Sequence, residues 1–187
     1  MRKSYMLVLG ACFLSASALA EGRGWVFFPA FKEGWNPHFT FAATAGYMDP
    51  DSSLGDADTT WGLQLSLDCP WFMPPKGAIR QVFNYNAYED GKLTLQTIEM
   101  NPRYFMTITP GLILGIGPGI GYVIADADVG RDANMWALQV GADLEYRYEH
   151  LFLGLSARYQ HTQQERVGID DEGADNWLTL LKAGITF

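Results

Sequence analysis

The sequence predicts an all-β fold, an eight-stranded antiparallel up-and-down transmembrane β-barrel over residues 37–187. First, eight segments alternate apolar and polar residues with a period of two, the pattern of strands with one apolar face. Second, aromatic residues stand near the ends of these apolar faces, where membrane barrels carry interfacial girdles. Third, long polar loops alternate along the chain with mostly shorter connections, as in outer-membrane barrels whose termini both lie in the periplasm.

Residues 1–20 are predicted to be a cleaved secretory signal peptide. Arg2 and Lys3 precede an apolar run, and a small-x-small cleavage pattern ends at Ala20. The run is shorter than the roughly 20 residues that a membrane-spanning helix needs. An uncleaved N-terminal anchor and lipoprotein processing at Cys12 are the two alternatives. The signal peptide indicates that the protein is exported.

Residues 21–36 are predicted to form a periplasmic or interfacial segment before the barrel. The stretch reads EGRGWVFFPAFKEGWN and is rich in aromatic residues. Because aromatic rings favour the boundary between lipid and water, Trp25, Phe27 and Phe28 are expected to lie at the membrane interface.

The first four predicted strands cover residues 38–47, 61–68, 80–88 and about 92–106. The second, WGLQLSLD, has a tryptophan and three leucines at alternate positions, with glycine, glutamine, serine and aspartate between them. In the fourth segment the parity of the alternation slips near Thr97. A β-bulge is therefore predicted there, since one extra residue in a strand reverses the faces that follow it.

The last four predicted strands cover residues 111–124, 135–147, 151–161 and 176–187. The fifth contains GIGPGIG, whose glycines recur at alternate positions. This is not the G-x-G-x-x-G pattern of a nucleotide-binding loop, and no helix is expected after it. The glycines are instead expected to face the barrel interior, beside large side chains or where the wall bends.

Strand length and loop position favour a barrel over a soluble β-sandwich. The predicted strands are about 9 to 13 residues long, whereas strands of globular proteins have a mode of about 5 to 6. Four polar and mostly acidic loops follow the first, third, fifth and seventh strands. The other three connections are CPWFMPPKGA, TITP and RYEH, of which the first is unusually long.

The charge balance excludes nucleic acid as a partner, because phosphate binding needs an excess of Lys and Arg. The formal net charge is -8, and removal of residues 1–20 leaves 11 basic and 21 acidic residues, a net charge of -10. Charged residues make up only 18% of the chain, below the roughly 25% of soluble domains. The mature chain keeps one cysteine, Cys69, so no intramolecular disulfide is expected.

The polar faces of the predicted strands carry charges of both signs in nearly equal number. An interior of low dielectric constant requires such charges to pair. We therefore predict a salt-bridge network that plugs the lumen, with a narrow gated pore as the alternative. Its members are Arg80, Glu99, Arg103, Asp143, Glu145, Arg147, Arg158 and Lys182, with Asp68 at one end.

The chain ends in LLKAGITF, with apolar residues at every second position before a final aromatic. With the eight strands and the signal peptide, this ending resembles the small outer-membrane barrels of the OmpA/OmpX type. The likeness covers about residues 37–187 and implies an outer-membrane location with outer-membrane lipids and lipopolysaccharide as partners. It also implies that Leu181, Ala183, Ile185 and Phe187 form the signal that the barrel-assembly machinery reads. A monomer is expected.

RYQHTQQ, in the seventh strand, is the sharpest catalytic candidate. It resembles the PagL-type lipid A deacylases, in which a His-x-Ser pair and a following acid form an esterase triad on the barrel exterior. The resemblance implies His161 as base and Asp175 as its orienting acid. The nucleophile position holds Gln163 instead of serine, and Thr162 is expected to point to the opposite face. A hydrolase of this kind needs a hydroxyl within reach of the base.

Metal binding is predicted to be absent or weak, and no cofactor is expected. Asp126, Asp128 and Asp132 surround Gly130 in a loop that faintly resembles a calcium site. Solvated acidic loops are the simpler interpretation, with weak divalent binding as the alternative. The three histidines have no metal-ligand spacing.

The sequence therefore predicts a non-enzymatic outer-membrane barrel that maintains the envelope or takes part in surface interactions. The two alternatives are a lipid A esterase with an atypical site around His161, and a small gated channel.

Overall fold

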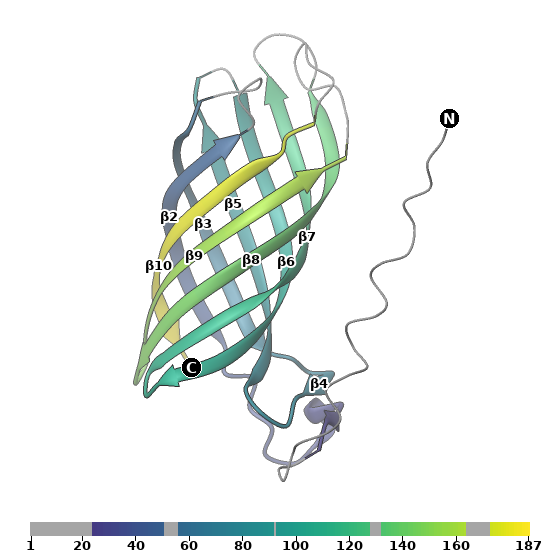
Figure 1. Cartoon of the computed structure of the whole chain (residues 1–187), viewed down its shortest axis with the longest axis vertical. Helices are drawn as coiled ribbons and strands as arrows, with labels where there is room; N and C mark the ends of the chain where they lie inside the picture. The colour runs from purple at the N-terminus through teal and green to yellow at the C-terminus, as the bar shows by residue number, and fades with distance from the viewer. Residues whose placement is uncertain (1–23, 51–55, 92, 128–131, 164–172) are drawn as a thin grey trace, which may run out of the picture.

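The computed structural model describes residues 24–50, 56–91, 93–127, 132–163 and 173–187, and eight of its strands close into a barrel (Figure 1). Every neighbouring pair is antiparallel, in the order β10-β2-β3-β5-β6-β7-β8-β9. The predicted fold class is confirmed. Within the described ranges, no helix has the length and hydrophobicity needed to cross a membrane. The barrel strands are β2 (Thr40–Pro50), β3 (Asp58–Asp68), β5 (Ala78–Glu89), β6 (Leu93–Thr109), β7 (Leu112–Ala127), β8 (Ala133–Tyr148), β9 (Leu151–Thr162) and β10 (Asn176–Thr186).

The barrel closes where the last strand, β10, pairs with the first barrel strand, β2, along their whole lengths. Gly46 and Gly184 lie on this seam, and a Cβ atom at either would overlap a carbonyl oxygen of the facing strand. The backbone N–H of Phe187 donates to the carbonyl of Phe39 at 2.8 Å, beyond the end of the ladder. The C-terminus is thus fixed at what we call the lower end of the barrel (Figure 1).

Two tight turns at the lower end differ from the prediction. TITP was expected as a connection, but β6 continues to Thr109 and the turn consists of Pro110 and Gly111, with Gly111 at φ 83°. The turn between β8 and β9 contains only Glu149 and His150. The expected length of 9 to 13 residues was therefore wrong for β6, β7 and β8, which have 17, 16 and 16 residues. β-Branched residues before the turn favour the extended backbone that lengthens β6.

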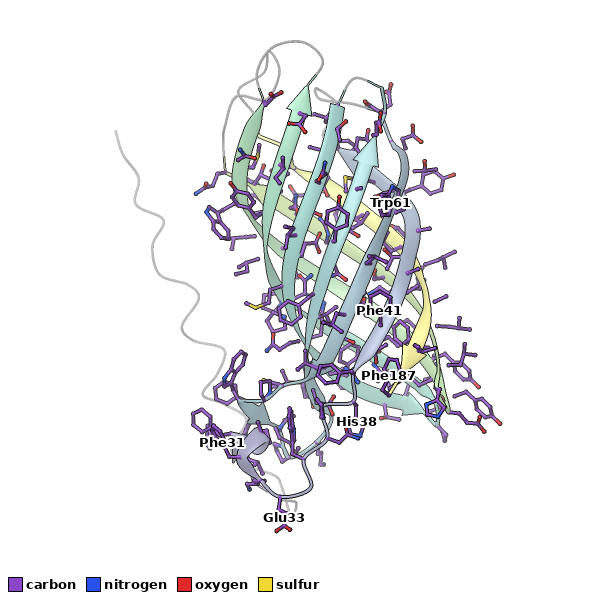
Figure 2. The ribbon with its side chains drawn as sticks, turned by 180° about the vertical axis from the view of Figure 1, so that it is seen from behind. Phe31, Glu33, His38, Phe41, Trp61 and Phe187 are labelled. Carbon is purple, nitrogen blue, oxygen red and sulfur yellow. The ribbon has the colours of Figure 1, made fainter. Side chains whose placement is uncertain are left out.

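The outer wall of the barrel is apolar and carries aromatic side chains toward both ends. Near the upper ends of the strands, Trp136 contacts Tyr122 with ring centroids 5.3 Å apart, and Trp177 contacts Tyr159 at 5.0 Å. Figure 2 shows Trp61 high on the wall, and Phe41 and Phe187 lower down. The alternation seen in the sequence thus places large apolar side chains on the outside, the reverse of a soluble domain.

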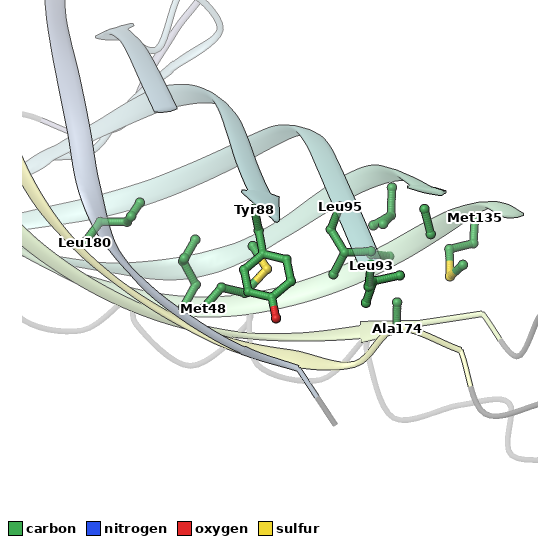
Figure 3. Close-up of a cluster of buried hydrophobic side chains, with 11 residues drawn as sticks. Met48, Tyr88, Leu93, Leu95, Met135, Ala174 and Leu180 are labelled. Atoms are coloured by element: carbon green, nitrogen blue, oxygen red, sulfur yellow. The ribbon is translucent and has the colours of Figure 1, made fainter. Parts of the chain in front are cut away.

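The predicted β-bulge at Thr97 is wrong, because the upper part of the barrel interior is apolar. The β6 register runs without a shift through Thr97, and the irregularity lies between Thr107 and Thr109. The parity slipped in the sequence because Leu93 and Leu95 face the interior, where they are buried. They belong to an apolar cluster drawn in Figure 3. Its members are Met48, Tyr88, Leu93, Leu95, Val123, Ala125, Met135, Ala137, Ala174, Leu178 and Leu180.

A small unit lies below the barrel, and we call it the foot: residues 24–37 and 69–77. It contains β1 (Val26–Phe27), the 3-10 helix η1 (Pro29–Phe31) and β4 (Phe72–Met73), which pairs with β1. The long connection between β3 and β5 is therefore structured, together with most of the predicted pre-barrel segment. Residues 1–20, the predicted signal peptide, lie outside the described residues.

Candidate functional site

Lys182, Asp143 and Arg103 form the centre of the charged interior. Lys182 Nζ lies 2.6 Å from Asp143 Oδ1, and Arg103 Nε lies 2.9 Å from Asp143 Oδ2. Lys182 also donates to Gln64 Oε1 at 2.6 Å. All four side chains are buried. One carboxylate therefore balances two cations from β6 and β10, which ties opposite parts of the wall together.

Glu99, on β6, is a second centre of the interior. Its Oε1 lies 2.6 Å from Arg158 Nη2. Thr97 and Asn86 donate to the same oxygen, both at 2.9 Å, and Asn101 donates to Oε2 at 3.1 Å. One cation and three neutral donors therefore surround this buried carboxylate.

The remaining predicted interior charges lie nearer the lower end. Arg147 pairs with Glu145 at 2.7 Å, and Arg80 pairs with Asp68 at 3.4 Å. Arg80 also donates to the carbonyl of His38 at 2.8 Å. A cavity between the Glu99 and Asp143 groups has a volume of only about 10 Å³, close to the smallest space that holds one water molecule. The lumen is filled by side chains at this level.

On the outer wall, the structure brings together the three candidate residues of the seventh predicted strand and the segment after it. The Nδ1 of His161 donates to Asp175 Oδ2 at 2.6 Å. Thr162 donates to Asp175 Oδ1 through its backbone N–H at 2.7 Å and its hydroxyl at 3.0 Å. The arrangement follows from the pairing of β9 with β10, where Asn176 faces Gln160, so that Asp175 meets the end of β9.

Hydrogen bonds stabilise the charged form of the Asp175 carboxylate. Partial burial alone would raise its pKa, but hydrogen bonds from Thr162 and His161 outweigh this effect, and the pKa lies below its ordinary value. Tyr159 adds a further donor at 3.2 Å. An ionised Asp175 orients the His161 ring through Nδ1, so Nε2 is the ring nitrogen that the carboxylate does not engage.

An open groove of about 760 Å³ runs beside His161 on the outer wall. Three of its members are polar, among them the imidazole of His161, whose side chain is 66% exposed. The other four are apolar, and this part of the groove suits an acyl chain. It is lined by Ile120, Trp136, Ala137, Leu138, His161, Thr162 and Gln163.

Within the described ranges, no nucleophile is aligned with His161 in the groove. The Thr162 hydroxyl is buried on the interior side, where it donates to Asp175 and accepts from the backbone N–H of Ala174 at 2.7 Å. Gln163 lines the groove but has no hydroxyl. Among the described residues, no hydroxyl is hydrogen-bonded to His161. The arrangement can orient a general base but supplies no attacking side chain.

The acidic loop candidates do not form a metal site in the part of the chain that is described. Asp126, near the end of β7, and Asp132, just before β8, are both exposed. Asp128 lies outside the described residues. No group of three or more potential ligands from His, Cys, Asp and Glu occurs within the described ranges.

Sequence reasoning missed several residues that complete these sites. Gln64 is a buried partner of Lys182, and Tyr159 and the Thr162 backbone brace Asp175. Trp136 shapes the groove from a neighbouring strand. Each is a cross-strand contact, so the register of the strands was the information needed to find it.

No protein-family model matches this chain, and no curated protein sequence matches it. Solved structures do resemble it. Neisserial surface protein A has a TM-score of 0.55 at 19% identity, covering 79% of this chain and 95% of its own. Ail, the attachment invasion locus protein of Yersinia pestis, has a TM-score of 0.52 at 14% identity, covering 82% and 100%.

The N-terminal β-barrel domain of Pseudomonas aeruginosa OprF is similar to the same extent, with a TM-score of 0.53 at 14% identity and coverage of 82% and 100%. At these identities the likeness concerns the fold. The chain has the architecture of the small eight-stranded outer-membrane barrels.

Proposed function

We propose that this chain is a monomeric protein of the bacterial outer membrane, exported with a cleaved signal peptide, and with both termini in the periplasm. Its role is non-enzymatic, either structural or in surface interactions, and its partners are outer-membrane lipids and lipopolysaccharide. The observation that carries the proposal is the closed barrel with an apolar, aromatic-rimmed outer wall around paired interior charges. Such a surface is stable only in lipid.

A closed lumen is part of the proposal. The apolar cluster occupies the upper interior, and the ion pairs of Glu99 and Asp143 occupy the level below it. An ion would have to displace both layers in order to pass. This argues against the small gated channel that the interior charges alone would allow.

Membrane fractionation and conductance test the proposal. Expressed in a Gram-negative host, the protein is expected in the outer-membrane fraction as a heat-modifiable band. In planar bilayers it is expected to give no conductance steps above the baseline, with an open porin as the positive control. Recovery in the soluble periplasm, or regular conductance steps, would contradict it.

A lipid A esterase is the second candidate, and one observation favours it. His161 and Asp175 form a base and its orienting acid beside an apolar groove on the lipid-facing wall. No described residue places a hydroxyl in hydrogen-bond contact with His161, which weighs against it, because esterases of this kind attack through an activated hydroxyl.

Lipid A mass spectrometry separates the two candidates. We expect the acyl pattern of the host to be identical with the wild type, with His161→Ala and with an empty vector. The His161→Ala variant is the matched control, since an exposed side chain on the wall is removed without disturbing the interior. Loss of an acyl chain with the wild type but not with His161→Ala would overturn the non-enzymatic role.

A further inference from the structure

The foot carries a concentration of exposed apolar side chains that the barrel does not cover. Phe31 is 89% exposed, more than any other large apolar residue among those described. Monomers in water seldom expose a contiguous apolar patch of this kind, and those that do use it to bind a partner or a membrane. The exposed members are Trp25, Phe27, Phe28, Phe31, Trp71, Phe72 and Met73.

The foot is held in a defined shape, so its aromatic residues are not free to fold back onto the barrel. The rings of Phe27 and Phe72 meet edge to face at 6.0 Å across the β1–β4 pair. The N–H of Phe28 donates to the carbonyl of Trp71 at 2.8 Å, which joins the two segments. The N–H of Asp68 donates to the carbonyl of Pro37 at 2.7 Å and attaches the foot to β3.

The apolar surface of the foot continues that of the barrel wall. On the lower part of β6, Tyr104, Met106 and Ile108 are exposed, and the Tyr104 hydroxyl donates to the carbonyl of Lys76 in the foot at 3.0 Å. In Figure 2 Phe31 lies on the flank of the foot, near the level of His38, while the charged Glu33 lies at the tip farthest from the barrel.

We propose that the foot inserts its aromatic flank into the periplasmic leaflet of the membrane that holds the barrel. The partner is therefore a phospholipid surface. Phe31 on the flank, several further exposed Phe and Trp side chains in the same small unit, and the charged Glu33 at the tip match the composition of segments that lie in the interface plane. The exposed Lys32 and Lys76 can extend their ammonium groups to the headgroups. The inference rests on the proposed membrane location of the barrel.

Site-specific fluorescence in phospholipid vesicles tests this placement. Single cysteines are introduced as Phe31→Cys, Glu33→Cys and Leu181→Cys in a Cys12→Ser, Cys69→Ser background, and each is labelled with bimane. All three positions are exposed, so the barrel remains intact, and a heat-modifiable gel shift verifies this for each variant. The probe is then quenched in separate vesicle samples with phospholipids brominated near the headgroup end of the acyl chains, which report positions 31 and 33, or near the middle of the chains, which report position 181.

We expect quenching at position 31 to exceed that at position 33 at least about twofold, because interfacial side chains lie ~5–10 Å into the headgroup–acyl boundary. Quenching at position 181, on the barrel wall, tests whether the barrel is inserted in the membrane. Quenching at 181 with equal, low quenching at 31 and 33 would overturn the foot's insertion and leave the proposed function intact. That result would point to a protein partner for the flank. Absence of quenching at 181 would instead contradict the membrane barrel.

Discussion

Asp143→Ala is expected to lower the free energy of unfolding by about 3–5 kcal/mol, because it leaves two buried cations without a carboxylate. Asp143 lies 2.6 Å from Lys182 Nζ and 2.9 Å from Arg103 Nε, and all three side chains are at most 5% exposed. Urea unfolding of the protein in phospholipid vesicles, followed by tryptophan fluorescence, measures the effect.

Lys182→Met is the matched control for this prediction. It removes one cation of the same group but leaves Asp143 paired with Arg103, so the expected loss of stability is clearly smaller. The comparison separates the cost of an unpaired charge from the general cost of altering the interior. If both variants unfold at the same urea concentration as the wild type, water penetrates the lumen and the ion pairs do not stabilise the barrel.

The sequence was sufficient to predict the barrel because closure and lipid exposure impose a period of two on nearly every strand. The prediction failed where the interior is apolar as well. Leu93 and Leu95 are as hydrophobic as the residues of the outer wall, yet they face the interior. For this reason the bulge was predicted at Thr97, whereas the irregularity lies between Thr107 and Thr109. Period alone cannot tell an inward leucine from an outward one.

The candidate site was predictable in part. The pairing of His161 with Asp175 was predicted from the resemblance to the PagL-type deacylases. The structure brings the two residues together because they flank one connection and antiparallel pairing returns the chain to the same height. The partner of Asp143 could not be predicted, since Arg103 and Lys182 lie 40 and 39 residues away along the chain. Such pairs depend on barrel closure and on the register of several strands.

Phe187→Ser is expected to reduce the amount of assembled protein in the outer membrane several-fold, while the barrel that does assemble loses less stability than the Asp143→Ala barrel. Phe187 is 67% exposed on the wall, in line with Leu181, Ala183 and Ile185. Loss of its contact with lipid costs the folded barrel no more than about 1.5–3 kcal/mol. Quantification of the heat-modifiable band in the outer-membrane fraction measures assembly.

The structure also explains why the chain end itself would still be held in this variant. The Phe187 N–H bonds to Phe39 on one side, and the Thr186 N–H donates to the carbonyl of His150 at 2.9 Å on the other. These are backbone bonds, which serine retains. Phe41→Ser is the matched control, since it removes a lipid-facing phenyl ring opposite Ile185 without changing the terminus. If both variants assemble equally poorly, the lost lipid contact is responsible; if only Phe187→Ser fails, the terminal aromatic acts during insertion.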